Sequence, residues 1–448
     1  MRDRVRVGEG AGGTDAWISP ARDLALRGEL DYLTFECLAE RTIALAQTER
    51  LHNPEGGFDR LLVRRLEAVL GPCLARGTRI VSNMGAANPV GAGRMALEVA
   101  ARLGLGPLRV AVVRGDDVLA RLDPGMALAE TGQNLRDLGR RVVSANAYLG
   151  AEPIVAALEE GANLVLTGRV ADPSLAVACL RHAFGWPVDD WALLGAGTAV
   201  GHLLECGAQV TGGYFADPGV KDVPNPAAIG HPIAECDPDG SAIITKLPET
   251  GGLVSFATCA EQLLYEIHDP AAYRTPDVTA DFSRVELLPE GPDRIRVRGA
   301  SGSRRPELLK VSVGYRDGYI GEGQISYAGE GCVGRGRLAG EMVADRLEAA
   351  GLKLDELRID LIGCDALGGS AVARRPEPAE VRLRVAARCA SRELAQEIGL
   401  EVKALWLAGP AGGGGATEAI REVIAVGSVY VSRGLAPWEV EVLTWPDA

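Results

Sequence analysis

Four residues of one short stretch have the types and the spacing that acid–base or nucleophilic chemistry needs. On a helix through residues 201–213 (GHLLECGAQVTGG) they share one face, since they are spaced i, i+3, i+4 and i+7: His202, Glu205, Cys206 and Gln209. No Lys or Arg occurs between Arg181 and Lys221, so this polar stripe lies in an apolar segment. A buried Glu needs a partner, because an unpaired buried charge is costly. The stripe therefore predicts either an active site or a satisfied structural network.

Within this stripe, either His202 or Glu205 would serve as a general base, with the other as its orienter. Cys206 is either a nucleophile, which would indicate acyl transfer, or a buried spectator thiol. His202 and Glu205 could hold a divalent metal together with Glu36. One His and one Glu do not make a metal motif, so we do not favour a metal site.

Strands that alternate with helices would position a second group of polar residues. The sequence predicts strands at 31–36, 79–82, 108–114 and 163–167, each ending in a polar or glycine-rich tip. The alternation indicates an α/β fold with a mostly parallel sheet, whose strands bind ligands at their carboxyl ends. The residues expected to gather at that edge are Glu36, Asn83, Asn88, Asp116 and Arg169.

Two carboxylates follow these tips, at the starts of predicted helices. Glu40 is either a site residue or a complement to the helix dipole. Asp172 would be the N-cap, and Pro173 the first residue, of the helix after Arg169. We include Asp172 with Glu36 among the candidate catalytic residues.

Glycine-rich stretches at both ends of the chain are candidate anion sites. Near the start, a strand at 4–7 is followed by a loop with Gly10, Gly12 and Gly13, and then by a helix. That order aims backbone N–H groups at an anion, but the spacing is only loosely that of a dinucleotide fingerprint, and a tight turn is an equal alternative.

The stronger candidate anion site lies near the end of the chain. A strand is expected at 404–407 and a helix from Glu418, and between them come Gly412, Gly413, Gly414, Gly415 and Thr417. Glycines let a backbone approach a phosphate or carboxylate closely. No Lys precedes Thr417, so this is not a loop that binds a nucleoside triphosphate. The alternative to an anion site is a flexible glycine turn.

Changes in composition and in the predicted secondary-structure pattern divide the chain into three segments. Residues 1–215 would form an N-terminal α/β domain with the strand-tip cleft. Residues 216–330 are rich in Pro, Asp and Gly and then in strands, which predicts an inserted or second α+β domain with a hairpin around Arg316-Asp317-Gly318. Residues 331–448 return to the α/β pattern.

Composition excludes several classes of function. The chain has 448 residues, a formal net charge of −13 and a pI near 5.1, which argues against nucleic acid or an anionic membrane as a partner. No secretory signal or bilayer-length apolar run is visible. The nine cysteines contain no CxxC pair and fit reduced thiols. We therefore expect a cytoplasmic protein.

Several long blocks resemble one family, in an order that covers nearly the whole chain. They are FECLAERTIALAQ (35–47), RIVSNMGAANP (79–89), TGRVADPSL (167–175), GHLLECGAQVTGG (201–213), KLPETGGLVSFATCAEQLLYEI (246–267) and AGPAGGGG (408–415). In these blocks the chain resembles the acyclic terpene utilisation protein A (AtuA) family. This resemblance implies a part in bacterial breakdown of terpenes such as citronellol and geraniol, through branched acyl-CoA thioesters.

The resemblance also implies a reaction and a partner. The family role is cleavage of a 3-hydroxy-3-isohexenylglutaryl-CoA intermediate with loss of acetate. Many members carry a further C-terminal ferredoxin-like domain. Since this sequence stops at Ala448, we expect that a separate small ferredoxin-like subunit could supply it.

The preferred hypothesis is a carbon–carbon or carbon–oxygen lyase that acts on a branched 3-hydroxyacyl-CoA thioester or a related hydroxy acid. Such a reaction needs a base, stabilisation of an enolate and an anchor for an anion. Asn83, Asn88 and Gln209 would donate to the enolate or carbonyl oxygen, and Arg169 would clamp a carboxylate. No cofactor is identified beyond coenzyme A as part of the substrate.

Three alternatives remain open at this stage. The chain could be a non-catalytic subunit that binds an acyl-CoA or another acidic ligand, or a thiol or acid–base acyl-transfer hydrolase. A nicotinamide oxidoreductase is disfavoured, because no acidic residue other than Glu36 ends a second strand at the expected spacing. The charge-poor segment 186–214 could also be a subunit interface, and we expect a homo-oligomer.

Overall fold

The computed structural model describes residues 3–13, 16–369 and 378–444. The chain forms two compact units. The first comprises Met1–Gly314 with Val426–Ala448, and the second comprises Tyr315–Ala425. None of the helices in the described residues is long and apolar enough to cross a membrane.

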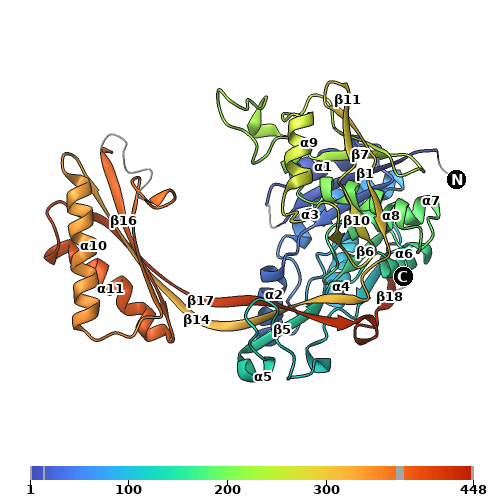
Figure 1. Cartoon of the computed structure of the whole chain (residues 1–448). Coiled ribbons are helices and arrows are strands. Elements are labelled where there is room, and N and C mark those ends of the chain that lie inside the picture. Colours follow the sequence, from blue (N-terminus) through green and yellow to red (C-terminus); the bar gives the residue numbers. More distant parts are fainter. Residues whose placement is uncertain (1–2, 14–15, 370–377, 445–448) are drawn as a thin grey trace. The chain divides into compact units, whose positions relative to one another are not determined.

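One large sheet organises the first unit (Figure 1). Within the described residues its strands follow the order β11 (Glu286–Gly291), β12 (Arg294–Arg298), β8 (Ala242–Lys246), β7 (Pro232–Cys236), β1 (Val5–Gly12), β2 (Tyr32–Glu36), β3 (Arg79–Ser82), β6 (Leu164–Thr167), β4 (Arg109–Arg114) and β18 (Glu439–Thr444). The five strands from β1 to β4 in this order are parallel, whereas the strands on both sides pair antiparallel. The α/β class is therefore confirmed, but the sheet is mixed rather than mostly parallel.

The segment expected to form an inserted domain contributes to this same sheet. Its strands β7, β8, β11 and β12 extend the sheet beyond β1. The smaller compact unit instead begins at Tyr315 and ends at Ala425. Pairing between β7 and β1 connects the late segment to the start of the chain, a contact between residues more than two hundred positions apart that local composition does not indicate.

Helices connect and cover the strands of the first unit. They are α1 (Ser19–Arg27), α2 (Glu40–His52), α3 (Leu62–Arg76), α4 (Pro89–Arg102), α5 (Leu135–Leu138), α6 (Glu152–Glu159), α7 (Ser174–Phe184), α8 (Trp191–Leu204) and α9 (Phe256–Leu264). Short 3₁₀ turns are η1 (Leu119–Arg121), η2 (Gly139–Arg141), η3 (Gly207–Gln209), η4 (Pro226–Ala228) and η6 (Arg433–Leu435). Two of the helices have residues at their ends that commonly begin or terminate a helix. The Asn88 side chain caps α4, whose first residue is Pro89, and Gly77 ends α3 with a φ of 71°.

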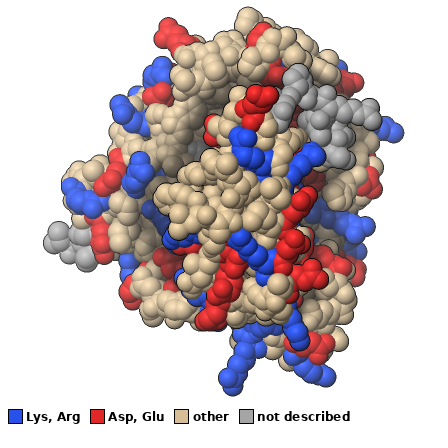
Figure 2. Space-filling model, turned by 90° about the vertical axis from the view of Figure 1, so that its left-hand side faces the viewer, with Lys and Arg blue, Asp and Glu red and all other residues tan. Residues whose placement is uncertain are grey.

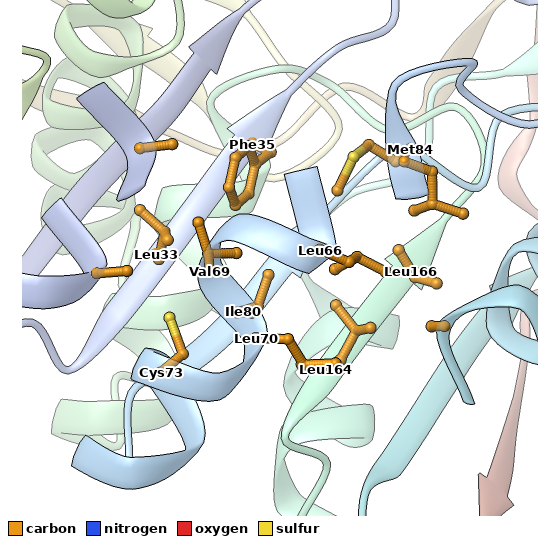
Figure 3. Close-up of a cluster of buried hydrophobic side chains, with 14 of the residues drawn as sticks. Leu33, Phe35, Leu66, Val69, Leu70, Cys73, Ile80, Met84, Leu164 and Leu166 are labelled. Atoms are coloured by element: carbon orange, nitrogen blue, oxygen red, sulfur yellow. The ribbon is translucent and has the colours of Figure 1, made fainter. Parts of the chain in front are cut away.

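The core of the first unit lies between α3 and the parallel strands, as Figure 3 shows. Leu66, Val69 and Leu70 of α3, at helical spacing, face Leu33 of β2 and Ile80 of β3. All are at most 1% exposed. Burial of this apolar layer, at about 25 cal/mol per Å², fixes the plane of the sheet and with it the positions of the strand ends.

A small second sheet supports the end of α8. It consists of β13 (Ser301–Ser303), β10 (Thr279–Asp281) and β9 (Tyr273–Arg274). A Cβ on Gly195 of α8 would lie 1.9 Å from the backbone oxygen of Ser301, so only glycine lets the helix approach this strand. The sheet therefore holds Tyr273 next to the last turn of α8.

The second unit contains parts of two long strands and the elements between them. The order along the chain is β14 (Leu308–Ala328), α10 (Cys332–Ala349), β15 (Glu356–Ile362), β16 (Glu380–Cys389), α11 (Arg392–Ala408) and β17 (Gly414–Ser432). Their order in the sheet is β15-β16-β14-β17. The start of β14, up to Gly314, belongs to the first unit, where β14 pairs with β5 (Val142–Ala147). A βαββαβ chain with this strand order has the ferredoxin-like arrangement. Both helices contribute to its apolar core.

Three of the expected local structures in this region are wrong. Residues 310–327 form one continuous strand, because Asp317-Gly318 is a kink in a strand whose two halves pair with different strands, β5 and β16. Residues 404–407 belong to α11, whose buried positions recur at helical spacing from Ala395 to Leu405. Residues from Glu418 continue β17, because the stretch up to Val431 is rich in Val and Ile.

Charges of both signs are distributed over the protein surface. On the face shown in Figure 2, Lys and Arg side chains alternate with Asp and Glu, without a large area of either sign. The net charge of −13 is therefore not gathered on this face. Many exposed side chains of opposite charge form ion pairs, as Arg102 does with Glu67.

Candidate functional site

A cavity of about 970 Å³ lies within the first unit, at the ends of the central strands and helices. Its size is in the range of small-molecule sites. The polar residues that line it include Glu36, Glu40, Tyr148, Arg169, Asp172, Glu205, Cys206, Gln209, Glu266, Tyr273 and Lys310. The cavity therefore brings together six of the candidate catalytic residues: Glu36, Arg169, Asp172, Glu205, Cys206 and Gln209.

Glu36, the last residue of β2, is held by three donors. The backbone N–H groups of Leu38 and Gly13 donate to its carboxyl oxygens at 2.8 and 3.2 Å, and the amide of Asn83 donates at 3.1 Å. Burial raises the pKa of Glu36 to about 8, and the nearby charge of Asp172 adds to this effect. Asn83 lies behind Glu36 and also accepts from the Cys37 N–H at 2.7 Å, so it orients this carboxyl from outside the cavity lining.

Arg169 follows β6 and is buried, with 1% of its surface exposed. Its guanidinium donates to Asp172 at 2.7 Å and to the Leu38 carbonyl. Its backbone N–H donates to Asp116 at 2.9 Å, which fixes the turn after the strand. Burial opposes the charge of Arg169, but Asp172, Tyr148 and Glu36 raise its pKa, so a fixed positive charge stands in the cavity wall.

Asp172 was expected to cap helix α7, and this is wrong. Pro173 occupies the N-cap position, and no side chain caps this helix. The carboxylate of Asp172 instead pairs with Arg169, because it lies three residues later in a tight turn. A buried guanidinium needs such a partner, because an unpaired buried charge is costly.

His202 and Glu205 form a direct pair at the end of α8. Their Nδ1 and Oε1 atoms are 2.7 Å apart. The imidazole packs against the rings of Phe282 and Tyr273, with centroids 5.9 and 5.6 Å away. Among the described residues, Oε2 of Glu205 and Nε2 of His202 have no hydrogen-bond partner. Glu205 lines the cavity and His202 supports it from behind.

The protonation of this pair is set by burial. Burial lowers the pKa of His202 to about 4, and it raises the pKa of Glu205 well above its usual value, with the charges of Asp172 and Glu266 adding to the rise. Burial therefore favours the neutral imidazole and the protonated carboxyl over an ion pair of the two. In the protonated form Glu205 would be a proton donor, whereas the sequence suggested a base at either His202 or Glu205.

Cys206 and Gln209 also line the cavity, but not as part of one helix. Helix α8 ends at Leu204, and Gln209 lies in the 3₁₀ turn η3. Burial raises the pKa of the Cys206 thiol to about 12, so the thiolate is scarce at neutral pH. Gln209 still reaches the cavity because the turn continues in the same direction as the helix.

The glycines near the start of the chain are packing residues. Strand β1 continues through Gly12, so the expected loop at 8–12 is wrong. A Cβ on Gly10 would lie 2.4 Å from the Phe35 ring, and one on Gly12 would lie 2.4 Å from the backbone carbonyl of Cys206. Gly12 and Gly13 line the cavity, where they let β1 end against the segment that carries Glu205.

The remaining candidates lie elsewhere. Asn88 caps α4 by accepting from the Gly91 N–H at 3.0 Å. Gly412 and Gly413 directly precede strand β17 of the second unit, and Gly414, Gly415 and Thr417 lie within it, so none of them stands at the helix N-terminus that the anion prediction required. The Thr417 hydroxyl accepts from Arg382 at 2.8 Å.

Sequence reasoning missed Tyr148 and Lys310, and left Glu40 open. The Tyr148 hydroxyl donates to Glu40, and Lys310 donates to the same carboxylate at 3.2 Å. Burial alone would raise the pKa of Glu40, but the Tyr148 hydrogen bond and the charges of Arg169 and Lys310 lower it to about 2. The one available signal was the apolar run VVSANA before Tyr148, which is strand β5.

Within the described residues, no three His, Cys, Asp or Glu side chains are placed to hold a metal ion. The donor set of the cavity is instead suited to proton transfer, with neutral acids, an ionised carboxylate and fixed cations.

Together these features define an α/β protein with an acid–base cavity at the carboxyl end of its central strands. The model of the acyclic terpene utilisation family protein AtuA matches residues 5–442. The chain belongs to this family, which associates it with acyclic terpene utilisation. No curated protein and no solved structure matched the chain.

Proposed function

We propose that this protein is a lyase that acts on a branched 3-hydroxyacyl thioester or a related hydroxy acid. The observation that supports it best is that Glu205, paired with His202 and with its pKa raised by burial, and a buried Arg169 line one cavity. The family's link to acyclic terpene utilisation agrees with a branched substrate of this class.

Cleavage next to a tertiary hydroxyl makes three demands. The hydroxyl proton must leave, the electron pair of the breaking bond must be stabilised on a carbonyl oxygen, and the resulting enolate carbon must receive a proton. Glu205 is the acid for the last step, since burial raises the pKa of its carboxyl and so favours the protonated form. Arg169 supplies a fixed positive charge for the enolate oxygen, in a site where burial strengthens electrostatic interactions.

The same groups suit elimination of the hydroxyl, because Glu205 could protonate the leaving oxygen. Both reactions belong to the lyase class. Acyl transfer through Cys206 is less well supported, since a thiol with a pKa of about 12 is a poor nucleophile at neutral pH.

The test is mass spectrometry of the products formed from 3-hydroxy-3-alkylglutaryl and 3-hydroxyacyl-CoA thioesters and from the free hydroxy acids, with and without Mg²⁺. We expect Glu205→Gln to lower turnover about a thousandfold while the fold is retained, because the amide keeps the shape but holds no transferable proton. The matched control is Glu98→Gln, an exposed position of α4, which should leave turnover unchanged.

Two results would contradict the proposal. If the parent protein consumes no compound of the panel but binds one of them, the chain is a binding subunit rather than a lyase. If Glu205→Gln turns over at the parent rate, the acid of the reaction is another group.

A further inference from the structure

Tyr148 contacts two cations at the wall of the cavity. The guanidinium carbon of Arg169 lies 4.1 Å from the centre of the Tyr148 ring, and the Lys310 ammonium lies 5.1 Å from it. Its hydroxyl donates to Glu40, which also accepts from Lys310 at 3.2 Å. Tyr148, Glu40 and Lys310 all line the cavity. The phenol is therefore held by cation–π contacts at its ring and by a hydrogen bond at its oxygen.

This group is electrostatically distinct from the Glu205 pair. The charge of Arg169 acts to lower the pKa of both Glu40 and Glu205. The charge of Glu40 raises the pKa of Asp172, and the charge of Asp172 raises the pKa of Glu205. Neither glutamate is among the main charges that act on the other. The Arg169–Asp172 pair thus lies between two separate proton-carrying groups of one cavity.

The two groups also differ in what they can do with a proton. Glu205 has a neutral imidazole as its partner and no donor on its second oxygen among the described residues. Glu40 has a hydroxyl and an ammonium as donors, so its carboxylate is ionised and can accept. The Tyr148 oxygen donates to Glu40 and accepts a hydrogen bond from the Arg169 side chain, so one lone pair of this oxygen remains for a substrate hydroxyl.

We propose that Tyr148 is a catalytic residue of this cavity, with Glu40 as the acceptor of its proton and Lys310 as the counter-charge. The inference rests on the lyase function proposed above and assigns the proton transfer at the substrate hydroxyl to a group other than Glu205. In this arrangement the substrate places its hydroxyl at Tyr148 and its carbonyl at Arg169.

The steps balance without a further reactant. The substrate hydroxyl gives its proton to the phenol oxygen while the phenol proton moves to the Glu40 carboxylate. The carbon–carbon bond next to the former hydroxyl carbon breaks, and its electron pair forms an enolate at the thioester, leaving a ketone. Glu205 then gives its proton to the enolate carbon. One proton passing through water from Glu40 to Glu205 restores both groups.

The test compares two reactions of the same variants. The first is cleavage of a 3-hydroxyacyl-CoA thioester, and the second is exchange of the α-hydrogens of the product thioester with D₂O, which needs the enolate half alone. Tyr148→Phe keeps the aromatic ring beside Arg169 and Lys310 and removes only the hydroxyl. We expect it to lower kcat for cleavage about a thousandfold with little change in KM. Exchange should stay within about threefold of the parent.

Glu40→Gln serves as the second variant, since it removes the proton acceptor without removing the phenol, and it should show the same split. Glu205→Gln should lose both cleavage and exchange. Glu98→Gln is the control for both reactions.

The inference is overturned if Tyr148→Phe cleaves the thioester at the parent rate, while the lyase function itself then stands. It is also overturned if Tyr148→Phe loses exchange as fully as cleavage with an unchanged melting temperature. If the parent protein cleaves no hydroxyacyl substrate, the proposed function fails and this inference fails with it.

Discussion

Glu205 and Glu40 line the same cavity with the same side chain, yet their pKa values are shifted in opposite directions, upward for Glu205 and downward for Glu40. Glu205 ends helix α8 beside a neutral His202, and the charges nearest to it include Asp172 and Glu266. Glu40 begins helix α2 beside Tyr148, Lys310 and Arg169. The two residues share their side-chain type but differ in burial and in neighbours, since the side chain of Glu205 is 10% exposed and that of Glu40 is 38% exposed. The difference teaches that the surroundings of a carboxyl, and not its residue type, set its role as acid or base.

The strongest way to break this difference is to remove the charge that both glutamates share. Arg169→Met leaves Asp172 and the nearby carboxyls without their buried counter-charge. We expect a loss of about 3 kcal/mol in the free energy of unfolding, measured by urea denaturation. Turnover should fall about a thousandfold, since the enolate charge also loses its partner.

The control for this change is Arg102→Met. Arg102 pairs with Glu67 at the surface, where an ion pair contributes little. Its unfolding free energy should change by less than about 1 kcal/mol. If the two variants are equally stable, the Arg169 charge does not support the cavity.

The comparison extends to a carboxyl behind the cavity. Glu9 of β1 is buried and accepts from Thr34 and from the Ala11 and Glu36 N–H groups. Burial nevertheless raises its pKa to about 8 from an ordinary value of 4.5. Between these two pH values the folded protein keeps the proton and the unfolded chain releases it. Stability is therefore present below the lower value and lost as pH rises toward 8.

Glu9→Gln removes this proton linkage and keeps the shape of the side chain. Relative to the parent, we expect the variant to lose less stability between pH 5 and 8, by up to about 1.4 kcal/mol per pH unit. Urea denaturation at a series of pH values measures this. Parallel pH curves for the two proteins would show that Glu9 is ionised in the folded state.

Local pattern predicted much of the first unit, because its strands end where the apolar runs end. Glu36 ends β2, and Arg169 follows β6. Both line the cavity, as expected from their places at the carboxyl ends of parallel strands. The spacing of His202 and Glu205 also predicted their contact. In these cases neighbours in sequence are neighbours in space.

The sequence failed where pairing over long distances decides the structure. Tyr148 and Lys310 are far apart in the chain and meet because β5 pairs with β14. The run of glycines at 412–415 opens a strand rather than a helix because β17 pairs with β14. Burial of individual carboxyls, and hence the assignment of acid and base, depends on the assembled cavity and could not be read from spacing.

The most direct test of the account is the infrared spectrum of the carboxyl groups at pH 7, recorded as differences between the parent protein and two variants. The account predicts that Glu205→Gln loses the carbonyl stretch of a protonated carboxylic acid, whereas Glu40→Gln loses the stretches of an ionised carboxylate. If Glu205→Gln instead loses carboxylate bands, or Glu40→Gln loses a protonated one, the two glutamates do not differ as described, and the assignment of acid and base is contradicted.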